Sequence, residues 1–192
     1  MKKLPLLAFV FIVACNFPSK EGKKYAFKEV GWTMTLPPQF KVLDTAGVKQ
    51  LNDKGKDLME KSAGTPVDIS ATRNLITAKK GMQYFTATIT PFDPQRDGDY
   101  AAANNAVKDM VLKTFSAQMP DATLDTASDG VKVGGLDFDR FRLSVSLKSK
   151  TIFTMFLLSK LYKGYDFGMN YLYTDPLSKA QIESILTSSK FE

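Results

Sequence analysis

Val30-Gly31-Trp32-Thr33-Met34-Thr35-Leu36 is the stretch that decides the fold of this 192-residue chain. It alternates apolar and polar side chains and is rich in residues that favour strands. Successive side chains of a strand point to opposite sides, so the face that carries Trp32 is apolar and both threonines lie on the other face. Pro37-Pro38 ends the pattern. The alternation predicts a strand with one buried and one solvated face.

Three amphipathic helices are predicted after this strand. The first spans about residues 45–61 and follows Asp44, a residue type that caps helix N-termini. The second spans about residues 100–119, and its apolar residues recur at spacings of seven and four, which predicts one buried face made of Tyr100, Val107, Val111 and Phe115. The third starts at Asp175-Pro176, the favoured pair of cap and first-turn residues, and has an inner stripe of Ile182, Ile185 and Leu186.

Runs rich in strand-forming residues predict strands over most of the remaining chain. Two of them, about 68–78 and 82–91, flank a turn at Lys79-Lys80-Gly81. Five more are expected at about 123–128, 131–133, 137–147, 151–162 and 165–174, with turns at 129–130, 134–135, 148–150 and 163–164. Because short connections join neighbouring strands, we expect an α+β fold: a mainly antiparallel twisted sheet flanked by helices.

The two ends of the predicted domain carry recognisable packing signatures. Residues 27–40 contain a tryptophan strand that ends in P-x-x-F, and residues 182–191 form a predicted terminal helix that ends in S-x-K-F. Together with the order strand, helix, hairpin, helix, meander, helix, these stretches resemble the PsbP-like group. That group includes an extrinsic photosystem subunit, a Ran-binding factor and bacterial envelope lipoproteins of unknown function. The resemblance covers about residues 25–192, implies binding or assembly more often than catalysis, and implies no active-site residue.

The N-terminus has the pattern of a lipoprotein signal. Lys2 and Lys3 precede an apolar run over residues 4–14, which is too short to cross a bilayer, and the chain's single cysteine, Cys15, comes directly after it. Residues 12–15 resemble a bacterial lipobox, which predicts a signal peptide over 1–14, lipidation of Cys15, a flexible tether over 15–24 and one α+β domain over 25–192. The alternative is an ordinary free or buried cysteine. The lipobox places the protein in the bacterial cell envelope, anchored to a membrane and facing the periplasm or the exterior.

The charge of the chain is mildly basic. There are 26 basic and 20 acidic residues, a net charge of +6, and removal of Lys2 and Lys3 leaves 24 − 20 = +4. This excess is spread along the chain, which favours weak attraction to anionic lipid headgroups and gives no sign of nucleic-acid binding. The expected partners are therefore the membrane, through lipidated Cys15, and an envelope protein or a small ligand.

Several catalytic arrangements are excluded by composition. The chain has no histidine, which excludes Ser-His-Asp and Cys-His systems and histidine-ligated zinc. No serine begins an S-x-x-K motif, and the glycines form neither a dinucleotide-binding fingerprint nor a phosphate-binding loop. We therefore expect no enzymatic activity and no cofactor.

Two groups of carboxylates are weaker candidates for chemistry. Asp137 and Asp139 lie on the same face of a predicted strand, about 7 Å apart, and are either an acid–base pair or an exposed strand start with Arg140 and Arg142 as partners. Three further carboxylates precede the second helix and either bind a hard cation or cap the helix: Asp93, Asp97 and Asp99. We favour the structural alternative in both cases.

An aromatic stripe and a set of lysines complete the candidates. The last predicted strand places five large side chains on one face, as core or as the wall of a ligand groove: Tyr165, Phe167, Met169, Tyr171 and Tyr173. Tyr171 and Tyr173 are the groove candidates. Five lysines lie at predicted hairpin tips: Lys79, Lys80, Lys148, Lys150 and Lys163. They are either the solvated side chains of ordinary turns or contact acidic headgroups or an acidic partner.

These observations favour a lipid-anchored, non-catalytic binding or accessory domain. One alternative is an assembly or chaperone-like factor that shields apolar segments of client proteins. A third, weaker hypothesis is an enzyme with an unusual carboxylate or lysine site.

Overall fold

The small sheet of the protein is built around the tryptophan strand. The computed structural model describes residues 21–192, so the predicted signal peptide and Cys15 lie outside the described residues. Strand β2 (Trp32–Leu36) is flanked by β1 (Lys23–Phe27) and β10 (Lys190–Phe191), in the order β1-β2-β10. Both pairs are antiparallel. The predicted alternation is confirmed, since the apolar side chains of β2 are buried and its threonines are only half-buried.

The large sheet has seven antiparallel strands in the order β3-β4-β5-β9-β8-β7-β6. Its first three strands are β3 (Lys41–Val42), β4 (Arg73–Lys80) and β5 (Gln83–Pro91). The other four are β6 (Thr123–Val133), β7 (Leu136–Leu147), β8 (Lys150–Tyr162) and β9 (Tyr165–Tyr173), which form a meander. The α+β fold with an antiparallel sheet is therefore confirmed.

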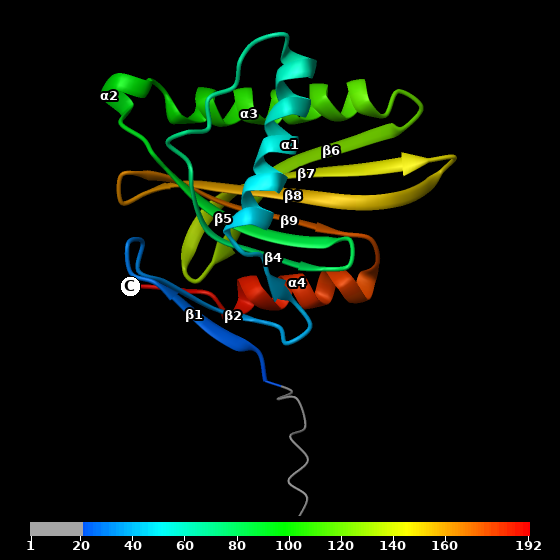
Figure 1. The fold of residues 1–192 in the computed structure, drawn as a ribbon. Helices are drawn as coiled ribbons and strands as arrows, with labels where there is room; N and C mark the ends of the chain where they lie inside the picture. Colours follow the sequence, from blue (N-terminus) through cyan, green and yellow to red (C-terminus); the bar gives the residue numbers. More distant parts are fainter. Residues whose placement is uncertain (1–20) are drawn as a thin grey trace, which may run out of the picture.

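The helices lie on both faces of the large sheet (Figure 1). Helices α1 (Thr45–Ala63), α2 (Pro94–Asp97) and α3 (Tyr100–Gln118) lie on one side, and α4 (Pro176–Ser188) lies on the other, next to the small sheet. The predicted caps are present: the Gly47 backbone N–H donates to Asp44 at 2.8 Å, and the Ser178 N–H donates to Asp175 at 2.9 Å. Within residues 21–192, no helix combines the length and apolar character needed to cross a membrane.

The main hydrophobic core lies between the large sheet and the layer formed by α4 and the small sheet. Trp32 is fully buried at its centre, with ring centroids 4.9 Å from Phe27 and 5.4 Å from Phe167. Alternate residues of β5 and β9 face this layer. A smaller cluster around Leu143 packs under α3 on the opposite face. Along its centre the sheet is thus buried on the face toward α4 and the small sheet and half-buried on the other face.

Four predicted boundaries were wrong. The predicted turn at residues 129–130 lies inside the continuous strand β6, because β7 is long enough to pair with it throughout. The predicted strand over 68–78 begins only at Arg73, since the Asp68 carboxylate accepts from the Ser70 N–H and forms a turn instead. The β4–β5 turn consists of residues 81–82, so both lysines before it belong to β4. The C-terminal helix ends at Ser188, and the chain then forms strand β10.

Four further differences concern side chains and short elements. Val107, predicted on the inner face of the second helix, is 48% exposed; Thr114 is the buried residue of α3. No side chain of α1 is buried, because this helix packs on α3 and not on the sheet. Strand β1 begins at Lys23, so the last two residues of the predicted tether lie in a strand. The short elements α2 and β3 were not predicted.

Candidate functional site

The predicted pair Tyr171 and Tyr173 lies on the face of β9 that packs toward α4. Both rings stack on Phe156 of β8, with centroid distances of 4.9 and 6.0 Å. Tyr171 is only 2% exposed and Phe156 is also buried, whereas Tyr173 is half-buried. The stripe on β9 is therefore core at its centre, and its C-terminal end forms an aromatic floor beside α4.

Arg140 covers this floor from β7. Its guanidinium carbon lies 5.6 Å from the centroid of the Phe156 ring, within the range of a cation–π contact. Two nitrogens of the same guanidinium donate to the two carboxylate oxygens of Asp129, with an Nε–Oδ1 distance of 2.8 Å. A guanidinium carries five N–H donors, so three are not used by Asp129.

Two hollows flank the aromatic floor along α4. The first, of about 420 Å³, is lined by Tyr171, Arg140 and Glu183 together with apolar residues that include Val131 and Leu186. The second, of about 360 Å³, is lined by Tyr173, Thr154 and Lys179 among others. The ammonium of Lys179 and the carboxylate of Glu183 approach to 3.8 Å, one helical turn apart. We call the two hollows together the α4 groove and define it by Arg140, Phe156, Tyr171, Tyr173, Lys179 and Glu183.

The surroundings of Tyr171 and Arg140 in the α4 groove set the protonation states of both side chains. Burial raises the pKa of the Tyr171 hydroxyl, the nearby Glu183 carboxylate raises it further, and Arg140 opposes the shift. The hydrogen bond to Asp129 raises the pKa of Arg140. At neutral pH Tyr171 is therefore a neutral hydroxyl and Arg140 a cation. This combination suits an oxyanion that accepts from Arg140 while an apolar group contacts the wall of the hollow.

The two candidate strand carboxylates are exposed at the start of β7. Asp137 pairs with Lys132 across the hairpin at 2.8 Å, and this hydrogen bond lowers the pKa of Asp137. The Asp139 carboxylate lies 3.5 Å from the Asn104 side-chain nitrogen. The expected arginine partners were wrong, since Arg140 and Arg142 pair with aspartates of β6 instead. A carboxylate held ionised is a poor general acid, so the exposed structural alternative is favoured.

The acidic residues before α3 act as helix caps. Asp93 accepts from the Gln95 N–H at the start of α2, and Asp99 accepts from the Ala102 N–H at the start of α3. Arg96 and the Asp93 backbone N–H hold the pKa of Asp97 at about 2. Within residues 21–192, no group of three or more acidic or cysteine side chains is placed to hold a metal ion.

A partly buried polar contact that the sequence did not reveal joins α3 to the sheet. The Tyr100 hydroxyl donates to the Asp166 carboxylate at 2.8 Å. Burial raises the pKa of Asp166, and the hydrogen bond from Tyr100 only partly offsets this shift. The alternation of β9 places Asp166 on the face opposite the aromatic stripe, and this placement is the only feature of the sequence that points to the contact.

Replacing Asp166 by asparagine should stabilise the protein at pH 7, because asparagine still accepts from Tyr100 and carries no buried charge. When the pKa of a carboxyl is higher in the folded than in the unfolded protein, the folded protein loses stability as the pH rises from the unfolded pKa, about 3.9, to the folded pKa. The gain should therefore be largest above that window and disappear near pH 3. Urea unfolding of both proteins at pH 3, 5 and 7 would measure it, and a variant equally destabilised at every pH would contradict it.

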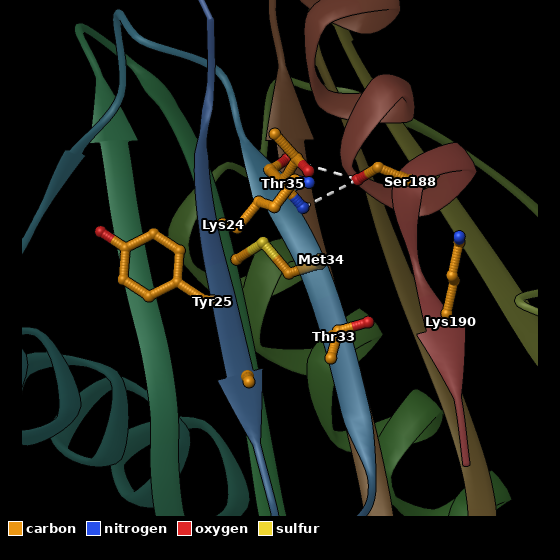
Figure 2. A pocket seen from close by; sticks show the side chains of 8 residues that line it. Lys24, Tyr25, Thr33, Met34, Thr35, Ser188 and Lys190 are labelled. Atoms are coloured by element: carbon orange, nitrogen blue, oxygen red, sulfur yellow. Dashed lines mark hydrogen bonds between the residues drawn. The ribbon is translucent and has the colours of Figure 1, made fainter.

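A hollow of about 530 Å³ lies on the small sheet (Figure 2). Eight residues line it: Lys24, Tyr25, Ala26, Thr33, Met34, Thr35, Ser188 and Lys190. The Ser188 hydroxyl accepts from the Thr35 N–H at 2.9 Å and fixes the end of α4 against β2. No carboxylate is among the lining residues, and both lysines are exposed.

The predicted hairpin-tip lysines have different roles. Lys80 donates to the Gln181 side chain of α4 at 2.7 Å, and Lys163 donates to the Glu192 carbonyl at 2.6 Å. The other three are exposed: Lys79, Lys148 and Lys150. Two of the five therefore hold the C-terminal segment, residues 176–192, against the sheet.

Comparison with one solved structure shows the fold. No protein-family model and no curated protein matches the sequence. The structure is similar to that of cyanobacterial PsbP (CyanoP) from Synechocystis, with a TM-score of 0.57 and 7% identity over 92% of this chain and 96% of that one. The chain therefore has the PsbP-like fold, which confirms the resemblance predicted from its sequence.

Two further solved structures are similar at lower TM-scores. One is a protein from Bacteroides thetaiotaomicron, with a TM-score of 0.41 and 12% identity, of which this chain spans about half: 90% of this chain aligns with 49% of that one. The other is LpqN, described as involved in cell envelope biogenesis of Mycobacterium tuberculosis, with a TM-score of 0.36 and 10% identity over 88% of this chain and 84% of that one. The fold assignment rests on the first likeness.

Proposed function

We propose that this protein is a lipid-anchored, non-catalytic binding domain of the bacterial cell envelope, and that the α4 groove holds its ligand. The observation that carries the proposal is Arg140, which lies over the Phe156 ring with three N–H donors not used by Asp129. The ligand class is a small molecule with a carboxylate or phosphate group and an apolar portion, since the same hollow is lined by the Arg140 cation and by the apolar side chains of Val131 and Leu186.

Binding is favoured over catalysis by the state of the groups in the groove. Tyr171 has a raised pKa and remains protonated, so it donates a hydrogen bond but is a poor base. Arg140 is a permanent cation. Such groups orient a ligand without exchanging protons with it, which is the behaviour expected of a binding module. The PsbP-like fold is consistent with an accessory role, and Cys15 supplies the proposed membrane anchor.

The proposal is tested by blocking the groove at its rim. Thr187 lines the hollow from the exposed side of α4, so Thr187→Phe should fill it and leave the core unchanged. Ser184→Phe is the matched control, because Ser184 is also exposed on α4 but does not line the groove. Each protein would be purified from detergent-solubilised membranes of its own host and denatured, and the released small molecules would be identified by mass spectrometry.

We expect a stoichiometric small anion from the wild type and from Ser184→Phe, and at least a fivefold smaller amount from Thr187→Phe. A bulky side chain forced into a filled space costs about 1–3 kcal/mol, which corresponds to roughly 5- to 150-fold in affinity. Equal amounts from all three proteins, or none from the wild type, would contradict binding in the groove.

One observation favours the second candidate function, an assembly or chaperone-like factor. Met82 and Leu177 are 64% and 69% exposed, and a hydrogen bond between the neighbouring Gln83 and Ser178 side chains holds their two segments together. Two large exposed apolar side chains on adjoining segments suit contact with a protein segment. In the same purification, a polypeptide that accompanies all three proteins in place of a small molecule would favour this function.

A further inference from the structure

The outer face of the small sheet is basic. Lys24 pairs in register with Thr35, and Lys190 pairs with Thr33, so both lysines share the face of the threonines, opposite the buried Trp32. Both lysines line the 530 Å³ hollow (Figure 2). Neither ammonium forms an ion pair with a carboxylate of residues 21–192.

The lysines of α1 are arranged differently. Two of them have an acidic partner one turn away: Lys49 lies 2.6 Å from Asp53, and Lys56 lies 3.6 Å from Glu60. Helix α1 lies on the opposite side of the molecule from the small sheet (Figure 1). The face near β1 therefore has unpaired positive charge, and the far face has partly neutralised charge.

The chain enters the domain at the edge of this basic hollow. A Cβ added at Gly22 would lie 2.6 Å from the Leu36 carbonyl oxygen and 2.7 Å from the Thr35 Cγ2 atom, so only glycine fits this close to β2. Eight residue steps separate Cys15 from Lys23, where β1 begins. A fully extended chain spans at most about 3.6 Å per step, so β1 starts within about 29 Å of an anchor at Cys15.

We propose that the outer face of the small sheet docks on anionic phospholipid headgroups of the membrane that holds the anchor. This inference rests on the proposed lipidation of Cys15, which keeps the face at high effective concentration near the bilayer. Phosphate oxygens accept hydrogen bonds from the ammonium groups of Lys24 and Lys190, which lie on either side of Thr33 of the central strand β2. Docking orients the domain, so that α1 and α3 point away from the membrane.

The test measures how fast individual lysines are acetylated in the anchored protein. The protein with its native anchor is reconstituted into vesicles of phosphatidylcholine, or of phosphatidylcholine with about 30% phosphatidylglycerol. Lys24 and Lys190 should react about fivefold more slowly in the anionic vesicles, because one lysine near an anionic surface gains roughly that factor in affinity. Lys54, exposed on α1, is the internal control and should not change. About 0.5 M NaCl should remove the protection.

The outcomes separate this inference from the proposed function. Flotation of the protein with both kinds of vesicle, but equal acetylation of Lys24 and Lys190 in both, would overturn docking while the anchor stands. A protein that floats with neither kind has no anchor, and docking then fails with the proposed function. Protection by inorganic phosphate in neutral vesicles would indicate a free-anion site and would also overturn docking.

A variant pair provides an independent readout. Lys24→Gln removes one charge of this face at an exposed position, and Lys54→Gln is the matched control on α1. In anionic vesicles we expect Lys24→Gln to reduce the protection of Lys190 by at least threefold, while Lys54→Gln retains it. Unchanged protection of Lys190 in Lys24→Gln would contradict docking through this face.

Discussion

Replacing Trp32 by alanine should lower the free energy of unfolding by about 3–5 kcal/mol, the range for deleting a large buried aromatic side chain. Trp32 is fully buried between the two sheets and packs against Phe27 and Phe167. Its indole N–H donates to the Ser189 hydroxyl at 3.1 Å, so the substitution also leaves a buried hydroxyl without this partner. The indole therefore connects β2, β9 and the end of α4.

The measurement is urea unfolding followed by far-UV circular dichroism, because Trp32 is the single tryptophan and its fluorescence disappears with the substitution. Thr33→Ala is the control on the same strand, since Thr33 faces the outer side and should cost less than about 1 kcal/mol. A loss below about 1 kcal/mol for Trp32→Ala would show that the core is not organised around this residue.

Replacing Cys15 by serine should abolish acylation completely, because the thioether forms on the cysteine sulfur and serine has none. The precursor should stay uncleaved by the lipoprotein pathway. Each buried methylene of an acyl chain contributes about 0.8 kcal/mol to membrane binding, and stable anchoring takes more than one chain. Removal of the lipid should therefore remove the principal attachment of the domain to the membrane.

Labelling with radioactive fatty acid measures the effect. A variant that combines Cys15→Ser with Ser19→Cys is the matched control, because it restores a thiol four residues away and outside the lipobox. We expect no label in either variant. Equal labelling of wild type and Cys15→Ser would disprove the anchor, and label in the combined variant would show that the thiol alone, and not the lipobox, directs acylation.

The strands and helices were predictable where one period dominated the sequence. Residues 32–36 alternate strictly, and their burial matches the alternation. Asp44, Asp99 and Asp175 cap helices whose starts were predicted to within a residue or two, because a cap is a local interaction between neighbouring residues. The prediction was wrong at residues 129–130, because pairing with the long neighbouring strand β7 outweighs the local preference of these residues for a turn.

The candidate groove was predictable only in part. The spacing of Tyr171 and Tyr173 indicated one face of a strand, and that face does border the α4 groove. The sequence predicts the wrong partner for Arg140, because it does not contain the register that sets Arg140 opposite Asp129. The contact of Tyr100 with Asp166 joins residues 66 positions apart and had no local signal.

By itself the amino-acid sequence determined the kind of secondary structure, the buried faces of its main strands and the PsbP-like order of elements, because each depends on patterns of neighbouring residues. Only the tertiary structure decided which charges meet, where the hollows lie and which face of the small sheet carries the exposed lysines. These features depend on strand register and on the packing of α4 and β10 against distant strands, and contacts of that range leave no periodic trace in the sequence.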